Sequence, residues 1–217
     1  MKTARKAIML VLCVVLLVVA SVMGTLAYLT DDDAVVNTFT VGNIQINLDE
    51  SNEATPEDST DRTETGNAYD DIQPGQTYVK DPTVTVLADS EDCYVRMLLT
   101  VTYDDCEGKE LKADDVLAKY KYQEWFDFNT NWTAQTEVKT VKANGKISRT
   151  YEFRYNDFVT TADGANKLPA LFTKITVPGA ITNAELATLE NLKIDVVAQA
   201  MQKAGFGTAE LAWAEWK

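Results

Sequence analysis

The sequence predicts an all-β protein: an antiparallel β-sandwich with a few short connecting helices, preceded by an N-terminal signal-peptide helix. Three features predict it. Apolar and polar residues alternate with a period of two over much of the chain, the dipeptide Asn144-Gly145 separates two such runs, and helical patterns are few and short. About seven strands with so few helices between them favour two packed antiparallel sheets over a parallel sheet.

The first 27 residues have the layout of a signal peptide. Three basic residues within the first six positions precede an uncharged run over residues 7–22, and small residues follow up to Ala27. We therefore expect cleavage between Ala27 and Tyr28 and a secreted domain of residues 28–217. A retained membrane anchor is the alternative, since residues 7–29 are uncharged and a span needs only about 20 residues. Three aspartates follow that stretch, which is no stop-transfer pattern.

Strands are expected wherever the alternation is clear. The first strand region includes Phe39 and Val41 and, after a bulge at Gly42-Asn43, residues 44–48. The expected strands that follow lie at residues 84–86, 94–103, 138–142, 147–155, 171–177 and 192–201. Because Asn144-Gly145 tolerates the positive φ of a type I′ turn, it should close a hairpin between two of them.

Short helices are expected as connections. Asp114 can cap a helix that extends to Tyr120. Thr182 and Glu185, three residues apart, form a capping box that opens a helix over residues 184–190.

Two groups of aromatic residues have both a packing and a binding interpretation. Residues 208–216 are expected to form a last helix whose apolar side chains plug one end of the sandwich: Leu211, Trp213 and Trp216. A second group lies between residues 120 and 132, and aromatics of this kind can stack on sugars. Its candidate ligand contacts are Tyr122, Trp125 and Trp132, although packing on a strand face is the more common use of such residues.

Charge limits the partners of the mature domain. Removing residues 1–27 leaves 17 Lys and Arg against 33 Asp and Glu, and such a surface repels phosphate backbones and anionic lipid. We therefore expect no nucleic-acid partner and no contact with the membrane except through the signal segment. Residues 49–71 hold nine acidic residues with Arg62 as their sole base, and they are expected to form a flexible loop.

The cysteines indicate free thiols. After cleavage only Cys93 and Cys106 remain, and a clear period-two strand separates them. Such a strand holds its ends about 30 Å apart, whereas a disulfide allows only about 7 Å between Cα atoms. We expect no bond between these two residues within one subunit, and a bond between neighbouring subunits stays open.

Residue types argue against an enzyme. The chain contains no histidine, which removes the commonest general base and most zinc sites. No phosphate-binding glycine loop and no nucleophile elbow occur, and the acidic clusters lack the spacing of a calcium-binding loop. We expect no cofactor and no structural metal site, with a weak surface calcium site left open.

Several short segments resemble a known family. They are TLAYLTD at residues 25–31, NTFTVGNI at 37–44, LDE at 48–50, QPGQ at 73–76, YVR at 94–96 and AMQKAGF at 200–206. Together they resemble the TasA and camelysin family of Gram-positive bacteria, whose precursors are cut by the dedicated signal peptidase SipW. The likeness excludes residues 49–71 and 104–145, and its N-terminal motif is the most specific part.

The resemblance implies a jelly-roll-like sandwich that serves as a subunit of extracellular matrix or surface fibres. In such fibres the N-terminal strand of one subunit completes a sheet of the next, by strand addition that uses backbone hydrogen bonds and side-chain pockets. Its implied partners are a SipW-type signal peptidase during export, other copies of the chain, and an anchor or accessory subunit. The candidate anchors of the donor strand are Tyr28, Val35, Phe39 and Val41.

Two alternatives remain at the level of sequence. One is a cell-surface module that does not polymerise and binds a sugar or a protein through the aromatic residues between 120 and 132. The other is a protease, since camelysin-like proteins have been described as proteases, but an ordinary metalloprotease needs histidine ligands that this chain lacks.

Overall fold

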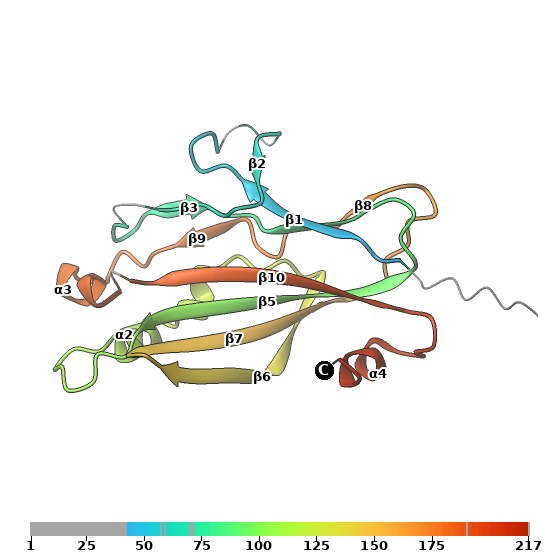
Figure 1. Ribbon diagram of the computed structural model, residues 1–217. Helices are drawn as coiled ribbons and strands as arrows, with labels where there is room; N and C mark the ends of the chain where they lie inside the picture. The colour runs from blue at the N-terminus through green and yellow to red at the C-terminus, as the bar shows by residue number, and fades with distance from the viewer. Residues whose placement is uncertain (1–42, 57, 59, 70–71, 190, 217) are drawn as a thin grey trace, which may run out of the picture. The chain divides into compact units, whose positions relative to one another are not determined.

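The computed structural model describes residues 43–56, 58, 60–69, 72–189 and 191–216. They form antiparallel sheets in two layers, joined by loops and a few short helices (Figure 1). The predicted all-β class with short connecting helices is confirmed for this part of the chain. The expected signal peptide and the strand residues Phe39 and Val41 lie outside the described residues.

The first layer is short and discontinuous. Its four-stranded sheet has the order β2-β1-β4-β8, and a separate two-stranded sheet pairs β3 with β9. Its strands are β1 (Ile46–Ser51), β2 (Arg62–Thr63), β3 (Thr77–Val79), β4 (Thr83–Val86), β8 (Asn166–Lys167) and β9 (Lys174–Thr176). The strand predicted over residues 171–177 is therefore limited to three residues.

The second layer is a continuous four-stranded sheet with the order β10-β5-β7-β6. Its strands are β5 (Cys93–Asp104), β6 (Trp132–Ala143), β7 (Lys146–Tyr155) and β10 (Lys193–Gln202). The alternation in β5 determines its orientation, because Met97, Leu99 and Val101 are at most 2% exposed and face the other layer. Their neighbours Leu98 and Thr100 are half-buried on the outer face.

The hairpin predicted at Asn144-Gly145 is confirmed. β6 ends at Ala143 and β7 begins at Lys146, and these two residues face each other in the register. Asn144 and Gly145 have φ of 53° and 72°, the left-handed values that a type I′ turn requires. A Cβ at Gly145 would meet no atom within 4 Å, so backbone conformation and not space selects glycine.

The connecting helices are α2 (Ala113–Lys119), η1 (Tyr122–Trp125), α3 (Asn183–Leu186), η2 (Ala187–Leu189) and α4 (Ala209–Ala214). The predicted capping box is confirmed, since Thr182 and Glu185 exchange both hydrogen bonds at the start of α3. The role predicted for Asp114 is wrong. Lys112 occupies the cap position of α2, and Asp114, within the first turn, instead accepts hydrogen bonds from Tyr103 and Arg149.

Helix α4 covers the outer face of the second layer, so the predicted plug at one end of the sandwich is wrong. Trp213 packs with Tyr94, which lies on the side of β5 that faces away from the other layer. The Arg96 guanidinium stacks on the same helix, 4.3 Å from the ring centre of Trp213 and 5.3 Å from that of Trp216. Leu211, which was expected to be part of the plug, is 58% exposed.

The acidic segment over residues 49–71 differs from the expected loop. β1 continues to Ser51, and β2 pairs with its end. Arg62 explains the difference, because its guanidinium forms ion pairs with Asp49 at 2.5 Å and Asp81 at 2.8 Å. Its pKa is raised by these two carboxylates against the opposing effect of burial. The two ion pairs of Arg62 thus hold β2 against β1 in a segment that has few apolar side chains to pack.

Cys93 and Cys106 are both free thiols, as predicted. The main core lies between the two layers, and its fully buried residues include Phe172, Leu171 and Tyr103. None of the described helices is long and apolar enough to cross a membrane.

Candidate functional site

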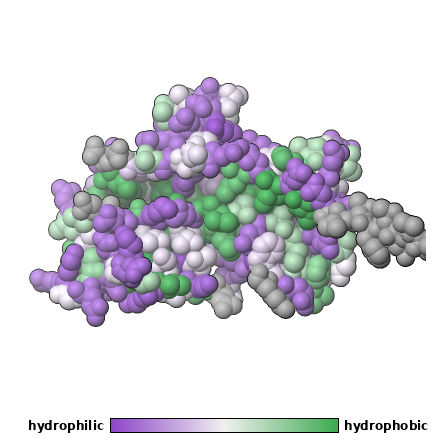
Figure 2. All heavy atoms as spheres, in the orientation of Figure 1, coloured by the Kyte–Doolittle hydropathy of each residue, from purple (hydrophilic) through white to green (hydrophobic). Residues whose placement is uncertain are grey.

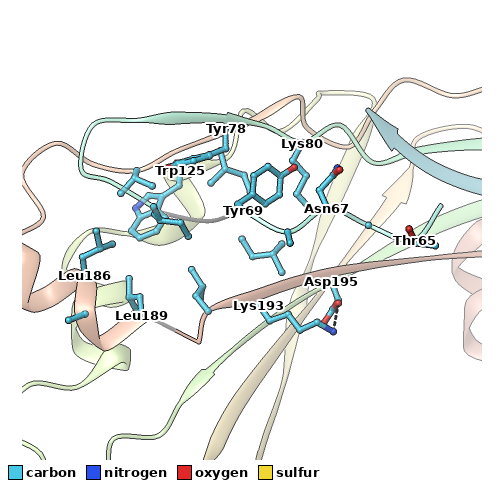
Figure 3. A pocket seen from close by; sticks show the side chains of 18 of the residues that line it. Thr65, Asn67, Tyr69, Tyr78, Lys80, Trp125, Leu186, Leu189, Lys193 and Asp195 are labelled. Carbon is cyan, nitrogen blue, oxygen red and sulfur yellow. Dashed lines mark ion pairs between the residues drawn. The ribbon is translucent and has the colours of Figure 1, made fainter. Parts of the chain in front are cut away.

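A groove that is open to solvent lies between the two layers. We call it the inter-sheet groove. Its volume is about 850 Å³, and Figure 3 shows β3 and β9 on one side and β10 on the other. Figure 2 shows hydrophobic residues along the hollow between the layers on the same face of the molecule. The lining residues used below are Asn67, Tyr69, Ile72, Tyr78, Lys80, Trp125, Ile175, Val177, Leu186, Leu189, Leu192, Lys193, Ile194 and Asp195.

Strand edges without a partner strand lie on both sides of the inter-sheet groove. β3 pairs with β9 alone, and β10 is the last strand of its sheet, paired with β5 alone, among the described residues. β1 does not continue past Ser51 to cover β3. Each edge of this kind presents unpaired backbone groups that can bond to a further strand.

Backbone geometry tells which groups of β3 face the open side. Gln76 accepts a hydrogen bond from Val177, and Lys80 donates one to Thr173, both toward β9. Because the bonding direction alternates along an antiparallel strand, the peptide groups of Thr77 and Val79 point to the open side. The Val79 carbonyl accepts a hydrogen bond of 2.6 Å from the Tyr69 hydroxyl, and no strand bonds to this edge within the described part of the chain.

The floor of the inter-sheet groove is apolar. It is formed by residues of η1, of β9 and the position after it, and of η2, each at most 7% exposed: Trp125, Ile175, Val177 and Leu189. The walls consist of apolar side chains that are only partly buried and pack against the main core: Ile72, Tyr78, Leu186, Leu192 and Ile194. Apolar side chains entering the groove would bury these walls and gain about 25 cal/mol for each Å² of apolar surface removed from water.

Two ion pairs lie beside the groove, one buried and one exposed. Lys80 forms an ion pair with Glu50 at 2.5 Å, and Lys193 with Asp195 at 2.8 Å, the pair drawn as a dashed line in Figure 3. Burial, and then the charge of Glu50, raises the pKa of Tyr69, so its hydroxyl stays a hydrogen-bond donor at neutral pH.

Glu185 ties the helical end of the groove to the rest of the fold. Its carboxylate accepts hydrogen bonds from Lys119 at 2.6 Å, from the Thr182 backbone at 2.9 Å and from Tyr120 at 2.8 Å. These hydrogen bonds lower the pKa of Glu185 to about 2, and the one from Lys119 has the largest effect. The carboxylate therefore holds α3 and η2, which carry two of the groove's leucines, against the C-terminal end of α2.

The three aromatics predicted as ligand contacts are core residues. Tyr122, Trp125 and Trp132 are 5%, 6% and 5% exposed. The indole nitrogens of Trp125 and Trp132 donate to the backbone carbonyls of Tyr120 and Pro169. This is the packing interpretation, and the structure offers no exposed aromatic platform from these residues. Only Trp125 touches the inter-sheet groove.

The remaining predicted site residues lie outside the described part of the chain. They are the cleavage-site residues Ala27 and Tyr28 and the donor-strand anchors Val35, Phe39 and Val41. The sequence did not predict the groove itself. Its described lining residues come from segments 65–69, 72–80, 183–189 and 192–195 and from Trp125, Ile175 and Val177. The strand expected at residues 84–86 corresponds to β4, whereas β3, the strand with the open edge, was not predicted.

The two lysines that line the inter-sheet groove, Lys80 and Lys193, form ion pairs with Glu50 and Asp195, and the floor residues named above are apolar. Among the described residues, no group of three His, Cys, Asp or Glu side chains is placed to hold a metal ion. What the arrangement can do is bind an extended apolar segment.

Comparisons of the chain with protein-family models, with curated proteins and with solved structures found no match in any of the three.

Proposed function

We propose that the mature chain is a secreted subunit of extracellular matrix or surface fibres. In this proposal a SipW-type signal peptidase removes the signal peptide after Ala27. The freed residues 28–41 of one subunit then enter the inter-sheet groove of the next as a donor strand. The added strand completes a jelly-roll-like sandwich. The resemblance of the N-terminal motif to the TasA and camelysin family supports the proposal at the level of sequence.

One observation carries the proposal at the level of structure: an apolar groove lies between two strand edges that have no partner strand in the described chain. Such a position suits a strand better than a compact ligand, because Thr77 and Val79 offer backbone groups and the floor offers apolar contacts. A donor strand uses both, with alternate side chains pointing into the groove.

Chain reach favours a neighbouring subunit over the same subunit as the donor. The first described residue, Asn43, accepts a hydrogen bond from Glu91 at the end of the fold where Ile46 pairs with Val86. The groove lies beside β3, about nine residues or 30 Å further along the β3–β4 segment. Residues 28–42 would use most of their length to cover that distance. A full donor strand with all four anchors can therefore enter only another copy.

Exchange of this kind is head-to-tail and does not close, so it produces a filament. The other long edge of the second layer is protected against pairing. β6 carries the exposed lysines Lys139 and Lys142 and has a register shift between Ala134 and Val138, features that blunt an edge strand. The edge of β3, with Thr77 and Val79, carries no charge.

The test compares the mature chain with a chain that lacks residues 28–39. Electron microscopy after concentration should show filaments of the first and only monomers of the second. A synthetic peptide of residues 28–41, added to the shortened chain, should bind in a one-to-one ratio and raise its thermal midpoint. A peptide of the same composition in scrambled order is the control. Filaments of the shortened chain would exclude this mode of assembly.

A second candidate rests on the size of the groove. A volume of about 850 Å³ lies within the range of about 300–1,000 Å³ that is typical of small-molecule sites. A surface module that binds a sugar or a peptide in this groove would stay monomeric with its N-terminus free. It would lose its ligand when Trp125 is replaced by leucine, and removal of residues 28–39 would leave binding intact.

A further inference from the structure

A buried lysine, a carboxylate and an amide meet beside the groove. The Lys80 ammonium lies 2.5 Å from Oε2 of Glu50, and the side chains of the pair are 8% and 7% exposed. The other carboxylate oxygen, Oε1, accepts a hydrogen bond of 3.0 Å from the Asn67 side-chain Nδ2 and one of 2.9 Å from the Asn67 backbone. A single carboxylate thus touches both an amine and an amide nitrogen.

The Asn67 side chain is held in one orientation. Its Nδ2 also donates to the Ser51 carbonyl at 2.8 Å, and its Oδ1 accepts from the Glu53 backbone N–H at 2.9 Å. The turn that presents Asn67 uses Gly66 at φ 80°, where the backbone passes close to the Glu50 carboxylate. A backbone N–H on Oδ1 is the kind of donor that stabilises negative charge on the oxygen of a carbonyl under attack.

We propose that these residues form an intramolecular amide bond between Nζ of Lys80 and Cγ of Asn67, with Glu50 as the group that transfers the protons. The cluster has the three parts that such a reaction needs: a nucleophilic amine, an amide carbonyl with a donor on its oxygen, and a base in contact with both nitrogens. None of these residues is a predicted anchor, so the proposal does not depend on how fibres assemble.

The reaction balances without an added reagent. Glu50 first takes a proton from the Lys80 ammonium, with which it is in contact. The neutral amine attacks Cγ of Asn67, and the Glu53 N–H holds the resulting oxyanion. Protons from Nζ pass through Glu50 to Nδ2, the Cγ–Nδ2 bond breaks, and the nitrogen leaves as ammonium. The carboxylate is regenerated, and one amide N–H remains at Lys80.

The bond would close the chain over residues 67–80 into a covalent loop. This loop contains Tyr69 and Ile72 of the groove and ends beside β3, whose edge is open. A covalent link at this point would hold the wall of the groove to the β1 end of the first layer. It would also keep the edge of β3 in place when force is applied along the molecule.

The experiment is mass spectrometry of the purified full-length chain. The intact protein should be lighter than its sequence by one ammonia molecule. After trypsin, cleavage is expected at Arg62 and absent at Lys80, because the amide has lost the charge that trypsin reads. The resulting peptide over residues 63–96 should show no fragments from within residues 67–80. A peptide that ends at an unmodified Lys80 would overturn the proposal. So would a cyclised Asn67 with the same mass loss and a cleavable Lys80.

Variants separate the roles. Glu50→Gln should keep the full mass, because the amide of glutamine cannot take up the proton, and Asn67→Ala should keep it because the electrophile is absent. Lys119→Met is the control. Lys119 also forms an ion pair with a glutamate, Glu185 at 2.6 Å, but no asparagine side chain bonds to that carboxylate among the described contacts. It should lose ammonia as the unaltered chain does. Loss of ammonia in Glu50→Gln would remove Glu50 from the mechanism.

Discussion

A proline at Val79 tests the open edge of β3 directly. Val79 is 39% exposed, and its peptide N–H faces the open side of the strand, away from β9. Proline is tolerated on an edge strand when the lost N–H made no ladder bond, and Tyr78 before it already has the extended backbone that proline demands. The carbonyl at position 79 stays available to Tyr69. We expect the subunit to fold with a stability within about 1 kcal/mol of the unaltered chain.

The cost should appear in assembly. An incoming strand would lose one backbone hydrogen bond, worth about 0.5–1.5 kcal/mol net, and would have one carbonyl left unpaired at a cost of about 1–3 kcal/mol. A central value of about 2 kcal/mol corresponds to a roughly thirtyfold rise in the subunit concentration needed for filaments, since about 1.4 kcal/mol is a factor of ten.

The assay is sedimentation of filaments over a series of subunit concentrations, with the concentration left in the supernatant as the readout. Thr140→Pro is the matched control. Thr140 lies on the edge of β6 that has no partner strand among the described residues. In the hairpin, Ala143 bonds toward β7, and so does every second residue before it, so the N–H of Thr140 points to the outer side. It should leave the supernatant concentration unchanged. An equal effect of both prolines, or none from Val79→Pro, would refute the assignment of β3 as the acceptor edge.

Three further predictions follow from individual residues. A thiol reagent should label Cys106 in the native chain and Cys93 only after denaturation, because burial and then the charge of Asp92 raise the pKa of Cys93 to about 11. Mass spectrometry of the labelled peptides measures the labelling rate of each cysteine, and equal rates in the native chain would contradict the prediction. The stabilisation of the folded chain by the Glu185 carboxylate should be complete above its ordinary pKa of 4.5. It should be lost as the pH falls toward about 2, since its folded-state pKa is lowered to that value. Unfolding midpoints against pH should therefore be flatter in this window for Glu185→Gln, and identical slopes would count against the role of that carboxylate. Phe172→Ala should cost about 3–5 kcal/mol in chemical denaturation, because the ring is fully buried against Phe126.

Local signals predicted the elements whose causes are local. The alternation of β5, the Asn144-Gly145 turn and the capping box of α3 each depend on residues within a few positions of one another, and all three are confirmed. The separation of Cys93 from Cys106 follows from the same alternation, since a strand of known rise fixes how far apart its ends lie.

The features that the sequence did not predict depend on contacts between residues far apart in the chain. Arg62 looked like a lone base among acids, yet its partner Asp81 comes from a segment 19 residues away. The apolar residues of α4 can be recognised in the sequence, and they led to its predicted place at an end of the sandwich. The surface that α4 packs on cannot be recognised, because Tyr94 and Arg96 lie at positions of β5 that the alternation assigns to solvent. The groove could not be predicted for the same reason. Whether a strand edge is open depends on where distant strands end, which local sequence patterns do not show.

A filament built by this exchange has two unlike ends. At one end a subunit has an empty inter-sheet groove, and at the other a subunit has free residues 28–41. Under the proposed exchange the donor strand does not reach the groove of its own subunit. Each isolated subunit would then have an empty groove and an unused donor strand, and two subunits would have to meet before growth begins. Filaments treated with a peptide of residues 28–41 and then washed free of it would have the groove occupied at one end only. When untreated subunits are added, growth at that end should stop, while the other end continues to add subunits. Growth measured at single filaments should therefore be one-sided after this treatment. Growth that stopped at both ends would mean that the donor segment contacts more than the groove beside β3.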